Sequence, residues 1–123
     1  MPHKTILLVE DEPVLRKMLC ETLVEDGFSV EVAETADAAW QKISDGLAFQ
    51  MLLTDVRMPG RLDGLDLARK VRDRAQPVSI IVMSGYIGAR EMDSTLGTFI
   101  AKPFTPLKMM QVVTRAMPPP RSN

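Results

Sequence analysis

Residues 51–64 read MLLTDVRMPGRLDG, in which a short apolar segment runs directly into Asp55 and then into a loop rich in Pro and Gly. Two other runs, TILLV (5–9) and VSIIVM (78–83), are equally short and almost unbroken. Runs of this kind are typical of strands that helices cover on both faces of a parallel sheet. The sequence therefore predicts three central strands, and it places Asp55 at the end of one of them.

Two weaker segments extend this sheet. FSVEVAE (28–34) alternates, with Phe28, Val30 and Val32 on one side, which favours an edge strand. TFIA (98–101) is a fifth, very short candidate. Because strands and helical periods alternate along the chain, we predict an α/β fold in which right-handed crossovers build a parallel sheet with helices on both faces.

Helical periods separate the predicted strands. The four clear ones run from Pro13 to a cap at Gly27, from 35 to 45, from 64 to 74 and from 106 to 117. The apolar stripe of the first helix is predicted to comprise Val14, Leu15, Met18, Leu19 and Leu23. That of the last is predicted to comprise Leu107, Met110, Val113 and Met117. Met109 is expected mainly to fill the core, and an outward position in which it helps a partner dock is left open.

The composition indicates one domain. The chain has 123 residues, 46% of them hydrophobic and 25% charged, and its net charge of -1 gives no overall attraction to nucleic acid or to an anionic membrane. The single cysteine, Cys20, lies in a helical pattern and is expected to be a reduced core thiol. With neither a signal-peptide core nor a membrane span in the sequence, we predict a cytoplasmic domain over 1–117 and a disordered tail over 118–123.

Most of the predicted strands end in a residue that can take part in chemistry. Glu10 and Asp11 follow the first strand, Asp55 the third, Ser84 the fourth and Lys102 the fifth. In open α/β sheets, ligands bind beyond the carboxyl ends of the strands. We therefore expect three carboxylates, a hydroxyl and an ammonium to meet at one edge of the sheet.

This combination of groups requires a cation. Three carboxylates within a few ångströms repel one another, and hard oxygen ligands with room for water favour Mg²⁺. Lys102 and Ser84 would add a second positive charge and a hydrogen-bond donor. A carboxylate in such surroundings suits phosphoryl transfer, with Asp55 as the nucleophile that becomes an aspartyl phosphate.

The strand-end motifs LLVEDE, LLTDVRMPG, IIVMSGY and FIAKPF together resemble the receiver domain of bacterial two-component response regulators, of the chemotaxis-type single-domain form. The resemblance spans residues 4 to about 117. It implies a flavodoxin-like (βα)5 doubly wound sandwich whose five-stranded parallel sheet has the order 2-1-3-4-5. No turnover of a separate substrate is then expected, because a receiver catalyses only its own phosphorylation and dephosphorylation.

The resemblance also implies roles for single residues. Asp55 would accept a phosphoryl group from the phosphohistidine of a sensor histidine kinase. Asp11 would bind Mg²⁺ directly, Glu10 would act through water, and Arg57 would contribute its backbone carbonyl. Each of these positions corresponds to one in the family's motifs.

A switch is implied as well. Ser84 and Lys102 would bind the phosphoryl oxygens, Lys102 would precede a cis peptide bond to Pro103, and Phe99 would enter the space left by Ser84. The surface that changes would comprise the fourth helix, the fifth strand and the fifth helix, and a downstream protein would read it. Nucleic-acid binding by this chain alone is not expected, and a homodimer is left open.

The chain departs from the family pattern near the acceptor. Glu10 stands where aspartate is commoner, and the loop GRLDG after Pro59 has one residue more than usual. The longer loop would bring Arg61 near the phosphorylation site. We predict Arg61, together with Tyr86, to modulate the reaction.

A third departure concerns the fourth helix. Ser84 and Lys102 are only 18 positions apart, from 84 to 102, about one helical turn less than the family usually provides. The fourth helix, within about 87–94, is therefore predicted to be short or irregular.

Other interpretations remain open at this point. Asp11 could cap the first helix, and Ser84 could be an ordinary turn residue. A haloacid dehalogenase-like phosphatase would need an aspartate where Arg57 stands, and a flavodoxin-like cofactor binder would need a Ser-, Thr- and Gly-rich loop in place of EDEP. The remaining alternatives are a pseudo-receiver, a phosphoryl shuttle or sink to a histidine phosphotransfer protein, and a receiver cut from a hybrid kinase or longer regulator.

Overall fold

A parallel sheet of five strands forms the centre of the protein. The computed structural model describes residues 4–74, 77–85 and 95–117. Its strand order, β2-β1-β3-β4-β5, confirms the order implied by the resemblance, with β2 at one edge. The strands are β1 (Thr5–Val9), β2 (Ser29–Ala33), β3 (Met51–Asp55), β4 (Ser79–Ser84) and β5 (Thr98–Ala101).

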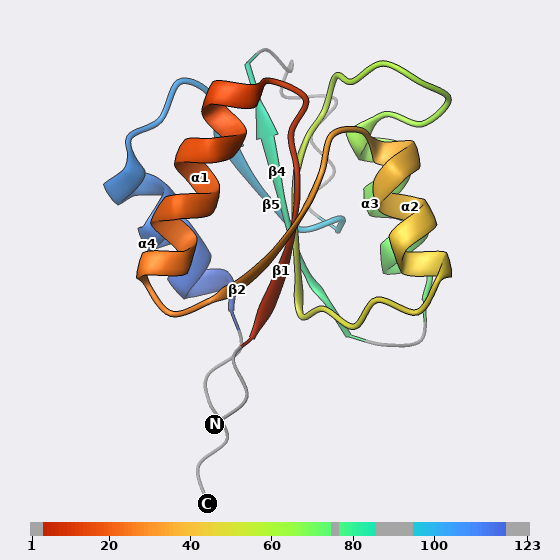
Figure 1. Ribbon diagram of the computed structural model, residues 1–123, viewed down its shortest axis with the longest axis horizontal. Helices are drawn as coiled ribbons and strands as arrows, with labels where there is room; N and C mark the ends of the chain where they lie inside the picture. Colours follow the sequence, from red (N-terminus) through yellow and green to blue (C-terminus); the bar gives the residue numbers. More distant parts are fainter. Residues whose placement is uncertain (1–3, 75–76, 86–94, 118–123) are drawn as a thin grey trace, which may run out of the picture.

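Four described helices cover this sheet, two on each face. They are α1 (Pro13–Glu25), α2 (Ala36–Ser44), α3 (Gly64–Arg72) and α4 (Pro106–Ala116). Figure 1 shows α1 and α4 on one side of the sheet and α2 and α3 on the other. The helix predicted within 87–94 and the predicted tail 118–123 lie outside the described residues, so α4 here is the helix predicted from 106 to 117. Within the described part of the chain, none of the helices has the length and apolarity that crossing a membrane requires.

The pleat of the central strands divides the core into two clusters. Leu7 and Val9 pack with the buried residues of α2 and α3, whereas Ile6 and Leu8 pack with those of α1 and α4. All four side chains are fully buried, and burial of an aliphatic side chain of this size contributes roughly 1.5–3 kcal/mol. The double burial explains why the strand sequence is an unbroken apolar run.

Two predicted helix stripes were wrong in part. Val14 is 76% exposed and Leu107 is 70% exposed. Met109, for which an outward position was left open, is fully buried, as is Val113. Both exposed residues follow the proline that opens their helix. The buried residues of these helices lie farther from the helix start, namely Leu19 and Leu23 in α1 and Met109 and Val113 in α4.

Strand register sets up the edge at which the polar residues meet. Val9 pairs with Thr54 and Asp55 pairs with Met83. Ser84 pairs with Ala101, so Lys102 follows the last pair of the sheet. The ends of β1, β3, β4 and β5 therefore lie at one edge, as the alternating pattern predicted.

Candidate functional site

Glu10, at the end of β1, is a fully buried carboxylate. Its Oε1 accepts a hydrogen bond from Lys102 Nζ at 2.8 Å, and its Oε2 accepts one from the backbone N–H of Glu12 at 3.1 Å. Its carbonyl oxygen accepts a hydrogen bond from Arg16 Nη1 at 2.9 Å. The side chain is thus fixed from both oxygens.

Asp55, at the end of β3, has a side chain that is 14% exposed. Its Oδ1 accepts the Val56 N–H at 2.8 Å, and its Oδ2 lies 2.9 Å from Lys102 Nζ. Gly64 allows α3 to begin directly against this strand, since a Cβ at that position would collide with the carbonyl oxygen of Asp55. The acceptor candidate is therefore held rigidly and still reaches solvent.

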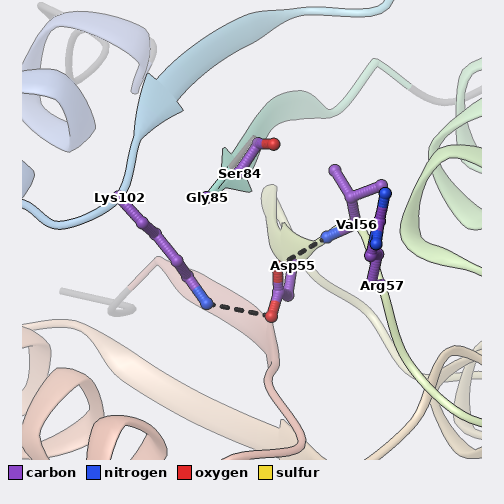
Figure 2. A pocket seen from close by; sticks show the side chains of 6 residues that line it. All are labelled: Asp55, Val56, Arg57, Ser84, Gly85 and Lys102. Carbon is purple, nitrogen blue, oxygen red and sulfur yellow. Dashed lines mark hydrogen bonds and ion pairs between the residues drawn. The ribbon is translucent and has the colours of Figure 1, made fainter. Parts of the chain in front are cut away.

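Lys102 joins the two carboxylates. Its backbone N–H donates to the carbonyl of Ser84 at 2.7 Å, and its peptide bond to Pro103 is cis, as predicted. Figure 2 shows the extended Lys102 side chain and Asp55 pointing toward one another. The backbone of Lys102 thus continues the pairing of β4 with β5, and its side chain brings the ammonium to the carboxylates at the ends of β1 and β3.

A third carboxylate completes the cluster. Glu10, Asp11 and Asp55 each offer an oxygen, and these oxygens lie within 4.8 Å of one another. The alternative in which Asp11 caps α1 is wrong, because the cap is Glu12, whose carboxylate accepts from the N–H groups of Val14 and Leu15.

Burial and pairing shift the ionisation of this cluster. Burial raises the pKa of Glu10, an effect that the hydrogen bond from Lys102 offsets only in part. Burial by itself would lower the pKa of Lys102, but its hydrogen bonds to Glu10 and Asp55 outweigh that effect and leave the pKa raised. The lysine therefore stays protonated wherever its two carboxylates are ionised.

The donor set fits a divalent cation. Counted at their formal charges, three carboxylates and one ammonium sum to -2. Carboxylate oxygens are hard ligands, and Mg²⁺ typically takes one or two of them and leaves its other positions to water or phosphate. Asp11 is exposed and Asp55 partly so, which leaves access for water.

A pocket of about 330 Å³ opens beside the cluster. It is lined by Asp55, Val56, Arg57, Ser84, Gly85 and Lys102 (Figure 2). An acceptor carboxylate and an ammonium thus face one space, which Ser84 also lines, although its hydroxyl points away from Asp55 in Figure 2. This arrangement can hold a small anion against Asp55.

The other predicted site residues lie farther out. Phe99 is half-buried and packs against the core cluster beneath α2 and α3. Arg61 is exposed and does not line the pocket, and its backbone N–H donates to Asp37. Tyr86 lies outside the described residues. The sequence interpretation missed Glu12, Val56 and Asp37, and only Glu12 carried a signal, as an acidic residue immediately before a helix-opening proline.

Comparison with known proteins gives a consistent result. Residues 6–114 match the family model described as the response regulator receiver domain. The transcriptional regulatory protein AruR of Pseudomonas aeruginosa is 32% identical over 115 residues, which cover 85% of this chain and 46% of that protein. ResD of Bacillus subtilis is 32% identical over 110 residues, which cover 85% of this chain and 44% of that protein. The chain thus spans a little under half the length of these curated relatives.

Solved structures are similar throughout the fold. The response regulator TrrA of Thermotoga maritima, solved in complex with Mg²⁺-BeF, has a TM-score of 0.82 and 28% identity and covers 93% of this chain and 99% of its own. A receiver protein of Pseudomonas putida has a TM-score of 0.81 and 29% identity and covers 94% of this chain and 98% of its own.

Proposed function

Because the chain belongs to the response regulator receiver domain family, we propose that it accepts a phosphoryl group on Asp55 from the phosphohistidine of a sensor histidine kinase. The observation that carries this proposal is the contact of Lys102 Nζ with both Asp55, at 2.9 Å, and Glu10, at 2.8 Å, beside an open pocket. An ammonium held there can stabilise negative charge that develops next to the nucleophile.

In the proposed reaction, a carboxylate oxygen of Asp55 forms a bond to phosphorus while the bond from phosphorus to the histidine nitrogen breaks. The electron pair of that bond stays on the imidazole, which takes up a proton as it leaves. Lys102 and Ser84 bind the phosphoryl oxygens. These residues act mainly by positioning and by charge neutralisation, which is how phosphoryl transfer is generally catalysed.

We propose Mg²⁺ as the cofactor. Asp11, Asp55 and the backbone carbonyl of Arg57 would hold it, with Glu10 acting through water, and the ion would neutralise charge on the transferring group. The charge of -2 and the hard oxygen donors of the cluster support this choice. Lys102 contributes the remaining positive charge without leaving Asp55.

The proposed output is a changed surface that a partner protein reads. Phosphorylation would draw Ser84 toward the new group and let Phe99 repack, which alters the surface formed by 87–94, β5 and α4. Ser84 and Phe99 support this idea because they lie on adjacent strands, β4 and β5. Arg61 and Tyr86 are proposed to modulate the lifetime of the phosphorylated form, and the cytoplasm is the proposed location.

Phosphorylation can be tested with a small-molecule phosphodonor. The protein is incubated with acetyl phosphate and Mg²⁺, and its intact mass is measured. We expect the mass of one phosphoryl group to be added to the wild type, and no addition to Asp55→Asn or in the presence of a chelator. Modification that persists in Asp55→Asn, or that does not depend on Mg²⁺, would refute the proposal.

The switch can be tested separately with a phosphoryl mimic. Beryllofluoride is suitable, since TrrA was solved with Mg²⁺-BeF. We expect amide chemical shifts within residues 84–105 to change on addition of beryllofluoride and Mg²⁺. Unchanged chemical shifts in that segment would refute the proposed conformational switch, although Asp55 could still be a phosphoryl acceptor. For Arg61→Ala, an unchanged lifetime of the phosphorylated form would remove Arg61 from the proposal.

A further inference from the structure

A side chain of α2 holds the loop that follows Asp55. The carboxylate of Asp37 accepts two backbone hydrogen bonds from this loop, one from the N–H of Arg61 at 2.7 Å and one from the N–H of Leu62 at 3.2 Å. Hydrogen bonds to an ionised acceptor are stronger than those between neutral groups. These hydrogen bonds connect the loop at Arg61, 24 positions farther along the chain, to the first turn of α2.

Asp37 is available for this contact because another residue caps its helix. Thr35 is the N-cap of α2, and its hydroxyl accepts from the N–H of Ala38 at 3.0 Å. Asp37, two residues farther on and half-buried, directs both oxygens to the loop instead. The two residues thus have separate tasks at one helix end, which makes them separable by mutation.

The loop is shaped to receive the Asp37 carboxylate. Gly60 has φ +116°, a conformation that favours glycine, and a Cβ at this position would collide with Oδ2 of Asp37. A side chain at position 60 would therefore force the carboxylate and the loop apart.

The same loop is fixed at its far end by α3. Asp63 and Asp66 form a reciprocal capping box at the start of that helix, with hydrogen bonds of 2.8 and 3.1 Å. The Gly64 N–H donates to the carbonyl of Val56 at 2.7 Å. Asp37 restrains the part of the loop between Arg57 and this cap.

We propose that Asp37 is a positioning residue for the metal site, because it orders the loop that carries the backbone carbonyl of Arg57. This inference rests on the proposed function, in which that carbonyl is a Mg²⁺ ligand. Mg²⁺ demands near-ideal octahedral geometry, so a loop that samples many conformations binds it less well. The extra residue of this loop increases the need for such a restraint, since a longer loop has more conformational freedom to lose.

The test combines two variants that break the contact from opposite sides. Asp37→Ala removes the acceptor. Gly60→Ala displaces it and also strains the loop at a φ of +116°, while the charge of the protein stays the same. Mg²⁺ dissociation constants are measured by NMR titration, and hydrogen exchange is measured at the Arg61 and Leu62 amides. We expect both variants to lose hydrogen-exchange protection at these amides. Asp37→Ala should bind Mg²⁺ about tenfold more weakly, which is the lower end of the loss of affinity seen when a residue that supports a metal ligand is replaced. The Mg²⁺ concentration for half-maximal phosphorylation should rise by the same factor.

Two controls separate this role from a general effect on α2. Thr35→Ala removes the cap of α2, and Asp45→Asn removes one negative charge from its other end. Both should bind Mg²⁺ like the wild type. The inference is overturned if Asp37→Ala binds Mg²⁺ as tightly as the wild type, or if Thr35→Ala weakens binding as much as Asp37→Ala does. A wild type that does not respond to Mg²⁺ would overturn the proposed cofactor, and this inference with it.

Discussion

Replacement of Asp11 by Asn should make the metal-free protein more stable. Asp11 lies within 4.8 Å of the carboxylate oxygens of both Glu10 and Asp55, whereas Lys102 contacts those two and not Asp11 in the described part of the chain. At 4.8 Å, each repulsion amounts to about 0.9 kcal/mol at the dielectric constant of water and about 3.5 kcal/mol at an effective value of 20. Because Asp11 is exposed, the lower value applies, and the ammonium of Lys102 beside the other two carboxylates offsets part of the two repulsions. The net cost is therefore about 0.5–1 kcal/mol.

Thermal and urea unfolding can measure this gain. For a domain of this size, 1 kcal/mol corresponds to about 4 °C in Tm, so Asp11→Asn should melt about 2–4 °C above the wild type in the presence of a chelator. Mg²⁺ should reverse the difference. At 100 times its dissociation constant, a bound ion adds about 2.7 kcal/mol to the wild type, whereas Asp11→Asn would lack one of the proposed ligands and should gain much less.

A matched control is Glu21→Gln, which makes the same change of charge farther along the exposed side of α1. Its stability should match that of the wild type with or without Mg²⁺. If Asp11→Asn is no more stable than the wild type in chelator, repulsion among the three carboxylates is not a significant cost of the fold. If its Mg²⁺ response equals that of the wild type, Asp11 is not a metal ligand.

Three further outcomes follow from the same geometry. Lys102→Met leaves the buried carboxylate of Glu10 without its ammonium, so the free energy of unfolding from urea titration at pH 7 should fall by about 2–4 kcal/mol, and by less at pH 4. The pKa of Glu10 is raised in the folded protein above its ordinary value of 4.5. The free energy of unfolding should therefore fall as pH rises from 4.5 through the raised pKa, because Glu10 must then ionise while buried. Over this pH range the urea midpoint of Glu10→Gln, which cannot ionise, should decline less than that of the wild type. Gly64→Ala forces a methyl group against the carbonyl oxygen of Asp55 and should lower the Tm by several degrees, at about 4 °C per kcal/mol.

The sheet could be predicted from sequence because helices bury its central strands on both faces. A strand covered on both faces must be apolar at consecutive positions, and TILLV, MLLTD and SIIVMS carry that signal without any other contribution. The polar residue after each run was equally informative, because parallel strands must present their carboxyl ends at one edge. Topology alone therefore brings Glu10, Asp55 and Lys102 to the same edge.

The buried faces of the helices were predicted less well, because the spacing of apolar residues along a helix does not determine which of them contact the sheet. Val14 and Leu107 fit an apolar stripe by spacing, yet both lie in a first turn and are exposed. For Met109, spacing left an outward position open, yet it packs in the same buried cluster as Val113, one turn later. The path of a helix across a twisted sheet decides such cases, and that path is a tertiary property.

The contact between Lys102 and Glu10 could not have been read from the sequence, and it changes the role expected of Glu10. Lys102 follows β5 and Glu10 follows β1, three strand spacings or about 14 Å apart in a flat sheet. The distance is closed by the extended side chain of Lys102 (Figure 2), whose Nζ reaches both Asp55 and Glu10. Both oxygens of Glu10 then have donors, Lys102 Nζ and the Glu12 N–H. A cation that recruits Glu10, even through water, must compete with the lysine for this carboxylate. Charge added at Asp55 would draw Lys102 away from Glu10, so phosphorylation and cation binding should favour one another at this site.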